Sequence, residues 1–289
     1  MIPADSTTTL SAADQVALRR AVDNLEKHDF AAQLADYAGK PLARAMRLMP
    51  KFATRRINKV VERAILNCLN VAIRSIELQS KAPPAQRAAT VLSGVSGGIS
   101  GFFGLAALPL ELPVTTTIML RSIADIARHH GEDLTTLEGR LACVEVFALG
   151  VSGEAERRTD FGYYASRTLL GRLTANTAAL LLERSAGDLS APMIGNLVGE
   201  IATRFSVTVT ERSAASVLPV LGAVGGATVN VLFMNHFQRI ARGHFAIRRL
   251  ERQYGANVVR RLYDEYAARG ERTARRASRG RLLVDRSGS

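Results

Sequence analysis

The sequence predicts a mostly α-helical fold: a single helical domain with a glycine-rich apolar helical hairpin-like pair and little or no β-structure. Three observations support this prediction. Apolar residues recur at helical spacing over most of the chain, one short stretch alternates with a period of two, and two long stretches rich in glycine are almost uncharged. With 289 residues, 47% of them hydrophobic, the chain is large enough to bury a sizeable core.

Residues 1–80 are predicted to be an N-terminal helical segment. Ser11 and Asp14 resemble a capping box at the start of a helix. Residues 51–79 carry apolar side chains on one side of a helix, namely Ile57, Val61, Ile65, Cys68, Ala72 and Ile76. The opposite side carries a cationic row, which consists of Lys51, Arg55, Arg56, Lys59 and Arg63. Such a row is either an ordinary solvated face or the polar side of a helix that lies on a membrane.

Residues 81–255 are predicted to be a helical core with two uncharged stretches. Residues 88–120 include Glu111 as their only charged residue, and residues 213–238 include no Asp, Glu, Lys or Arg. Each stretch is longer than the roughly 20 residues that cross a bilayer as a helix. Their length alone therefore raises the question of membrane contact.

Prolines argue against a single spanning helix in either stretch. Pro109 and Pro113 are expected to break the first stretch, and Pro219 is expected to interrupt the second. Each stretch is therefore predicted to form two shorter helical pieces joined by a kink or a hairpin. The sequence KAPPAQ at 81–86 is the best linker ahead of the core, because two consecutive prolines end a helix.

The sequence GVSGGISGFFG at 94–104 has two functional interpretations. Its first five residues fit the G-x-S-x-G pattern of serine hydrolases, with Ser96 as the nucleophile, but that motif requires a strand before the turn and a mostly parallel sheet around it. The chain offers almost no strands. The other interpretation is a helix face without side chains, which lets another helix or a lipid chain approach the backbone. We prefer the second interpretation.

The second uncharged stretch repeats this glycine spacing, and LRSIADIAR at 120–128 is echoed by MNHFQRIAR at 234–242. The residues predicted to contact lipid or membrane are therefore the glycines of both stretches and two adjacent phenylalanines: Gly94, Gly97, Gly98, Gly101, Phe102, Phe103, Gly222, Gly225 and Gly226. Tight packing inside a soluble helical core requires the same glycines and is the alternative.

Between the two stretches, residues 141–150, residues 162–173 and the segment that starts at Pro192 show helical spacing. The sequence FSVTVT at 205–210 instead alternates with a period of two. It is predicted to be a short strand, in contrast to the helices around it.

Seven polar residues in these helical segments are candidates for a polar core: Glu111, Arg121, Asp125, Glu145, His236, Arg242 and His244. A buried carboxylate must be paired or protonated. The partners expected for the two glutamates are arginines, namely Arg121, Arg204 and Arg212.

Two further patterns concern these polar residues. Arg121, Asp125, Arg128 and Glu132 share one helix face, and we expect these charges to pair along the helix. His244 lies on an apolar stripe of its helix, which predicts a hydrogen-bonded histidine in the core.

No cofactor, metal ion or catalytic residue is predicted. The sequence has no HExxH, no CxxC, no His–carboxylate pair at metal-binding spacing, no GxxxxGK[ST] loop and no GxGxxG after a strand. Cys68 and Cys143 lie in apolar helical patterns, so both are expected to be reduced thiols of the core.

Residues 256–289 are predicted to be a basic C-terminal helix and a flexible tail. From Arg239 to the end, the chain has fourteen arginines and five acidic residues, so most of the net charge of +12 lies there. This charge predicts an anionic partner, either nucleic acid or acidic lipid. Nucleic acid is disfavoured, because few aromatic residues accompany the arginines and no nucleic-acid-binding module surrounds them.

Five blocks of the chain together resemble the EcsC protein family. They are LPLELPVTTTIMLRSIADIAR at 108–128, EVFALG at 145–150, GYYASR at 162–167, IATRF at 201–205 and VLPVLGAVGGATVNVLFMNHFQRIARGHFAIRRLE at 217–251. The resemblance implies a bacterial-type, mostly helical protein of a family that is named for an ABC-transporter operon and has no agreed biochemical activity. It suggests an ABC transporter as a partner and transfers no catalytic residues.

The preferred function is that of a peripheral membrane-associated or lipid-binding protein, accessory to membrane transport. The apolar stretches would contact lipid or an acyl chain, and each arginine near the surface attracts anionic lipid by up to about 1 kcal/mol. The N-terminus lacks a signal peptide, which predicts a cytoplasmic protein at the inner face of the membrane. The alternatives are a serine hydrolase or peptidase-like enzyme that uses Ser96 and a soluble helical scaffold.

Overall fold

The computed structural model describes residues 10–26, 30–38, 49–74, 108–150, 162–183, 192–216 and 222–287. Within these ranges the regular structure is helical and no strand occurs, which confirms the predicted mostly α-helical class. The predicted hairpin-like pair falls partly on residues 88–107 and 217–221, which lie outside the described ranges. The helices are α1 (Ala12–Glu26), α2 (Phe30–Ala38), α4 (Lys51–Arg74), α6 (Leu108–His129), α7 (Leu137–Leu149), α9 (Tyr163–Glu183), α10 (Pro192–Ser216), α11 (Gly222–Tyr254) and α12 (Ala256–Ser287).

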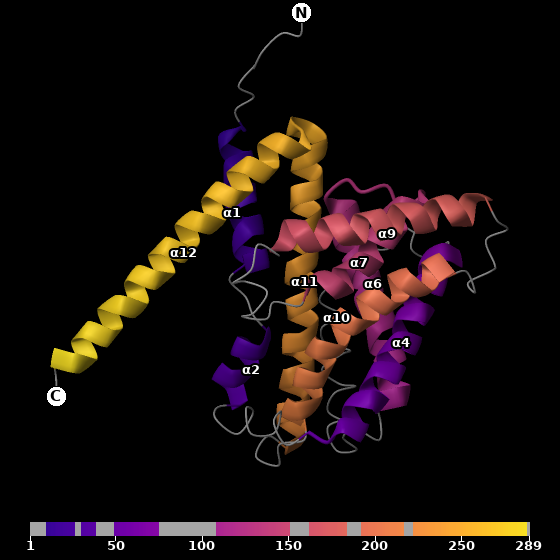
Figure 1. The fold of residues 1–289 in the computed structure, drawn as a ribbon, viewed down its shortest axis with the longest axis horizontal. Coiled ribbons are helices and arrows are strands. Elements are labelled where there is room, and N and C mark those ends of the chain that lie inside the picture. The colour runs from indigo at the N-terminus through magenta and orange to yellow at the C-terminus, as the bar shows by residue number, and fades with distance from the viewer. Residues whose placement is uncertain are drawn as a thin grey trace, which may run out of the picture.

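The long helix α11 is the centre of the bundle (Figure 1). Helices α1, α2, α6, α7, α10 and α12 all pack against it. Its buried side chains recur at helical spacing and include Phe233, Phe237, Ile240 and Ile247, none of which has exposed area. Because this apolar stripe must be covered, the helices around α11 are held to it by burial of apolar surface.

Phenylalanines from three helices form the aromatic centre of the core. The ring of Phe147 in α7 lies 5.0 Å from that of Phe205 in α10 and 5.7 Å from that of Phe237 in α11. Phe233 in α11 completes the cluster at 5.2 Å from Phe237. These centroid separations lie in the range of about 4.5–7 Å over which aromatic pairs attract each other. The cluster therefore joins α7, α10 and α11.

Residues 205–210, predicted to be a strand, belong to α10. Phe205 and Val209 are fully buried one helical turn apart, whereas Val207 between them is 46% exposed. The strand prediction is wrong because the period-two pattern is short and the packing of Phe205 in the aromatic cluster outweighs the modest β-propensity of valine and threonine.

Pro113 lies inside helix α6, so the expectation that it breaks the first uncharged stretch is wrong, whereas the residues before Leu108 lie outside the described ranges. Pro109 is the second residue of α6, where the missing N–H has no helical partner to lose. Pro113 lies one turn further on and has no N–H to donate to the carbonyl group of Pro109. That carbonyl group belongs to the first turn of α6. Pro219 and the linker 81–86 lie outside the described residues.

Helices α6 and α11 lie side by side and run in the same direction. Gln238 donates a hydrogen bond to the hydroxyl oxygen of Ser122 at 2.9 Å, and further along both segments Arg248 donates to Glu132 at 3.1 Å. Both contacts join residues that are 116 positions apart, as parallel segments in a constant register require. The two echoed sequences are therefore neighbours in the bundle.

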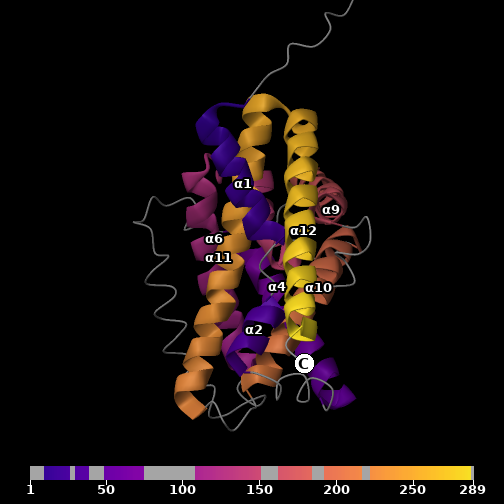
Figure 2. The same ribbon diagram turned by 90° about the vertical axis from the view of Figure 1, so that its left-hand side faces the viewer.

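Helix α4 runs alongside α6 in the same direction. Asn67 donates to the hydroxyl of Thr117 at 3.3 Å, and the carbonyl oxygen of Ile73 accepts from Arg140, near the start of α7, at 3.1 Å. Helices α4, α6 and α11 thus begin at one end of the bundle, the lower end in Figures 1 and 2. We call this end the basal end and the opposite end, where α6 and α11 finish, the upper end.

At the upper end, Gly255 reverses the chain between α11 and α12. Its φ of 87° lies in the left-handed region that glycine adopts without strain. The first turns of α12 pack on α1 and α11 through the buried side chains of Val259 and Tyr263. The remainder of α12 diverges from the bundle and runs back toward the level of the basal end (Figures 1 and 2).

The apolar side predicted for α4 is in the core, since Ile57, Val61 and Ile65 have no exposed area. The cationic row on its other side is exposed to solvent. Helix α4 therefore does not use this apolar side to lie on a membrane. Among the described helices, none combines the length and the hydropathy that a membrane crossing requires.

Cys68 and Cys143 are buried free thiols, as the sequence predicts. Burial raises the pKa of Cys68 to about 12 and also raises the pKa of Cys143. Both thiols are therefore protonated at neutral pH and behave as small apolar residues of the core.

The predicted cap of α1 is present and also connects α1 to α11. The backbone amide of Asp14 donates to Oγ of Ser11 at 3.1 Å, and the Ser11 hydroxyl donates to the Asp14 carboxylate at 2.8 Å. The same carboxylate accepts from Tyr254 and Arg249 of α11, each at 2.8 Å. These bonds, that with Tyr254 foremost, hold the pKa of Asp14 below its usual value.

Replacing Ser11 with alanine removes the acceptor for the first-turn amide. We expect Ser11→Ala to lower the free energy of unfolding by about 1 kcal/mol, measured by equilibrium urea denaturation of the full-length protein. Ser11→Thr keeps the acceptor and serves as the control. An alanine variant as stable as the threonine variant would show that the cap does not stabilise α1.

Candidate functional site

Most of the residues predicted to contact lipid lie outside the described residues, and Ser96 of the hydrolase interpretation lies there too. These undescribed positions are Gly94, Gly97, Gly98, Gly101, Phe102 and Phe103. Gly222, Gly225 and Gly226 form the beginning of α11 at the basal end. The register between α6 and α11 places these three glycines level with the start of α6.

The most exposed large apolar side chains of the described ranges lie at the basal end. Leu110 and Val114 in the first two turns of α6 are 81% and 57% exposed, and Phe52 in the first turn of α4 is 72% exposed. The other exposed large apolar side chains in these ranges reach at most 47%. The first turns of α4 also expose four cations, namely Lys51, Arg55, Arg56 and Lys59. We call these seven residues the basal surface.

Glu111 finds its partner in Arg212, one of the three arginines predicted for this role. The two side chains form an ion pair and are 11% and 6% exposed. Arg212 also lies over the ring of Phe233, 5.0 Å from its centroid. Arg121 is exposed and Arg204 binds a carboxylate of its own helix, so neither fulfils the role. The pair connects α6 to α10.

The predicted row of alternating charges along α6 forms only in part. Arg128 binds Asp125 at 2.6 Å, whereas Arg121 is exposed. Glu132 lies beyond the end of α6, after a turn at Gly131 with a φ of 73°, and pairs with α11. The expectation that Glu132 pairs along α6 is wrong, because the helix ends before it.

Both predicted histidines are buried and hydrogen-bonded. Nε2 of His236 donates to the carbonyl oxygen of Gly150 at 2.7 Å. Nδ1 of His244 lies 2.9 Å from the hydroxyl of Tyr163. Burial, together with the charges of two nearby arginines, holds the pKa of His244 well below its usual range, so this ring is neutral. The prediction of a hydrogen-bonded core histidine at position 244 is confirmed.

Glu145 of α7 is the most deeply buried carboxyl group in the described ranges, at 3% exposure. Thr174 of α9 lies beside it. Burial raises the pKa of Glu145 above the ordinary value of 4.5, against the weaker opposing effects of Thr174 and two arginines. The fold therefore favours the protonated form of this side chain.

The seven polar candidates do not form one site. Arg242 is exposed on α11 and donates to Gln238 one turn earlier at 3.4 Å. Its immediate neighbours in sequence, Ala241 and Gly243, face inward instead. The predicted polar core is thus made of several local interactions, and among its members Glu145 and His244 both lie near Arg167 and Arg248.

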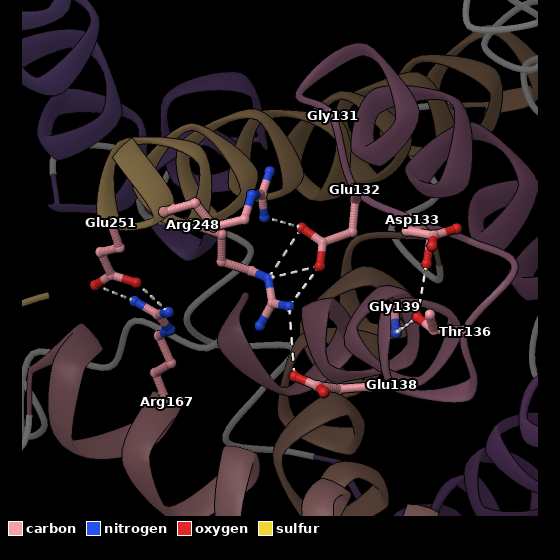
Figure 3. Close-up of a pocket in the computed structure, with 10 residues that line it drawn as sticks. Gly131, Glu132, Asp133, Thr136, Glu138, Gly139, Arg167, Arg248 and Glu251 are labelled. Atoms are coloured by element: carbon pink, nitrogen blue, oxygen red, sulfur yellow. Dashed lines mark hydrogen bonds and ion pairs between the residues drawn. The ribbon is translucent and has the colours of Figure 1, made fainter. Parts of the chain in front are cut away.

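A cleft of 440 Å³ opens at the upper end between the loop 131–136, the start of α7, α9 and the end of α11 (Figure 3). Charged side chains of both signs line it, among them Glu132, Glu138, Arg167, Arg248, Glu251 and Arg252. In the described ranges, no group of three or more His, Cys, Asp or Glu side chains is arranged to hold a metal ion. Most of the charged side chains that line the cleft are arranged as ion pairs.

Two clusters of ion pairs form the walls of the cleft. Glu132 accepts from Nε of Arg248 at 3.1 Å and from Arg252 at 2.7 Å. Burial disfavours ionisation of Glu132, but these two arginines outweigh burial and hold its pKa below the ordinary value. Across the cleft, Glu251 accepts from Arg167 at 2.7 Å and from a tyrosine hydroxyl at 3.1 Å. The walls are therefore fixed by charged hydrogen bonds.

The sequence contains one signal for this cleft, which is a group of charges at helical spacing. Arg248, Glu251 and Arg252 fall on one face near the end of α11. Their partners Glu132 and Arg167 are 116 and 84 positions away in the chain. No local pattern reveals contacts over such separations, so the cleft requires the tertiary structure.

The buried pair between Glu111 and Arg212 provides a stability test. Arg212→Met leaves Glu111 without its buried partner and is expected to cost about 3–5 kcal/mol of the free energy of unfolding. The double variant with Glu111→Leu removes both charges and is expected to regain most of that loss. Urea denaturation measures both. Equal destabilisation of the single and double variants would show that loss of packing, and not the unpaired charge, causes the effect.

Glu145 predicts a pH dependence of stability. Since its folded pKa is raised, its contribution is fully present below the ordinary value of 4.5 and is lost as the pH rises through the folded pKa. Glu145→Gln cannot ionise, so its stability relative to the natural protein is expected to increase as the pH rises above the ordinary value of 4.5. Urea denaturation of the variant and of the natural protein at each pH measures the difference between their free energies of unfolding. The titrations of all other groups are common to both proteins and cancel in this difference. A difference independent of pH would contradict the raised pKa.

Three comparisons with known proteins bear on identity. No curated protein and no solved structure matches the chain. A family model described as the EcsC protein family matches residues 15–250, which include most of α1 and most of α11. Because this match covers most of the chain, the protein belongs to the EcsC protein family.

Proposed function

We propose that the protein is a peripheral membrane protein that docks on an anionic lipid surface through its basal surface. The observation that carries this proposal is that Leu110, Phe52 and Val114, the three most exposed large apolar side chains of the described ranges, all lie at one end of the bundle. Exposed cations of α4 accompany them there.

The energetics favour a lipid partner for this surface. Full burial of an exposed leucine, valine or phenylalanine contributes about 1.5–3 kcal/mol per side chain. Each lysine or arginine near an anionic membrane adds about 1 kcal/mol. A surface that combines both contributions binds acidic lipid more strongly than neutral lipid, and it does so without crossing the bilayer.

Two further features support the same orientation. The glycines that begin α11 lie at the basal end of this helix. Helix α12 runs toward the level of that end, and its sequence from residue 269 to residue 286 contains seven arginines and two acidic residues. An anionic surface below the bundle would therefore meet apolar and cationic groups together.

Co-sedimentation of the full-length protein with vesicles tests this function. We expect binding to equimolar phosphatidylcholine and phosphatidylglycerol that weakens as salt rises, and much weaker binding to phosphatidylcholine alone. Phe52→Ser with Leu110→Ser is expected to reduce the affinity by about tenfold or more. The matched control is Val16→Ser with Leu169→Ser, which changes side chains that are 47% and 43% exposed elsewhere on the bundle.

A second double variant tests the cationic part of the basal surface. Arg55→Gln with Arg56→Gln is expected to weaken anionic binding and to flatten its dependence on salt. Arg20→Gln with Arg172→Gln removes two exposed arginines from other helices and is the control. Equal vesicle affinities for the basal and control variants would reject this docking surface, and absence of binding at low salt would reject the function.

A further inference from the structure

The cleft at the upper end has no part in the proposed docking, because it lies at the opposite end of the bundle from the basal surface. Its walls are already formed without a ligand. The side chains of Glu132 and Glu251 are 6% and 11% exposed, and each is held by arginine. Groups fixed in this way keep their orientation when a small molecule enters.

Arg248 has hydrogen-bonding capacity that these walls do not use. Its Nε and Nη2 both donate to Glu132. Its Nη1 forms no hydrogen bond with any residue in the described ranges, and Figure 3 shows this nitrogen turned away from Glu132. A guanidinium held on one edge and open on the other is suited to bind a carboxylate.

The carboxylate of Glu138 lies beside Arg248 and can accept further hydrogen bonds. Glu138, in the first turn of α7, is 69% exposed, and its only ion pair in the described ranges is a 3.8 Å contact with Arg248. This separation is too long for a good hydrogen bond. The Glu138 carboxylate is therefore available to accept hydrogen bonds from a ligand cation on the cleft side of Arg248 (Figure 3).

The presence of both acidic and basic side chains in the cleft determines the kind of ligand that fits. A simple anion in the cleft would approach Glu132, Glu138 and Glu251, and a simple cation would approach Arg167, Arg248 and Arg252. A molecule with one carboxylate and one ammonium group can direct each charge to the opposite sign. The volume of 440 Å³ is at the small end of ligand sites, which suits a molecule between an amino acid and a dipeptide in size.

We propose that this cleft binds a small zwitterion with a free carboxylate and a free ammonium group. The carboxylate accepts from Nη1 of Arg248, and the ammonium donates to Glu138. Arg167 and Glu251 form the facing wall. Binding of the zwitterion at the upper end does not depend on lipid docking at the basal surface.

Isothermal titration calorimetry with the full-length protein tests the ligand class. The probes are L-alanine and L-alanyl-L-alanine, together with N-acetyl-L-alanyl-L-alanine, which lacks the ammonium, and L-alanyl-L-alaninamide, which lacks the carboxylate. We expect saturable binding of at least one zwitterion and about tenfold or greater weakening for each singly charged analogue. Absence of saturable binding by both zwitterions, or equal binding of the singly charged analogues, would overturn the proposal.

A matched pair of variants assigns the binding to the cleft. Glu138→Gln is expected to weaken binding of the zwitterion about tenfold and to leave unfolding and vesicle binding unchanged. Glu265→Gln is the control, because Glu265 is 49% exposed and has the same 3.8 Å contact with an arginine, Arg269, on α12. Equal affinities of the two variants would place the ligand elsewhere and overturn the assignment.

Discussion

The fold depends on burial of the apolar stripe of α11. That helix is 33 residues long and touches most of the other helices, so covering its phenylalanines and isoleucines brings distant parts of the chain together. The contacts of Gln238 and Arg248 with the α6 segment then fix one register between the two parallel helices. Because both helices begin at the basal end and the segment after α6 reaches the last turns of α11, this register determines which residues meet at each end.

The two ends differ in their chemistry as a consequence. At the basal end, the first turns of α4 and α6 carry exposed apolar side chains, and those of α4 also carry exposed cations, a composition suited to a lipid interface. At the upper end, where α6 and α11 finish, acidic and basic side chains form a cleft of ion pairs. A protein held to a membrane by the first end would present the second end to solvent. The proposed lipid contact and the proposed zwitterion site therefore do not compete.

Four ionisable groups inside the bundle are accommodated in three different ways. Glu111 is neutralised by Arg212, a partner from another helix. Glu145 lacks such an ion pair among the described residues and has a raised pKa. His236 binds a backbone carbonyl and His244 binds a tyrosine hydroxyl. Each solution avoids an unpaired charge in the core, where desolvation would cost several kcal/mol, on the order of the net stability of a domain.

The sequence by itself determined the helical class, the buried side of α4, the cap at Ser11, the reduced thiols, the core position of His244 and the family, because these follow from local spacing or from motifs of adjacent residues. It failed at residues 205–210 and at Pro113, where core packing and position within the first turns of a helix override local propensity. Only the tertiary structure decided that Glu132 pairs with α11, that Glu111 selects Arg212, and that Arg248 and Glu138 share a cleft. Those contacts join residues about a hundred positions apart, and their partners are chosen by how the helices pack, which no local periodicity encodes.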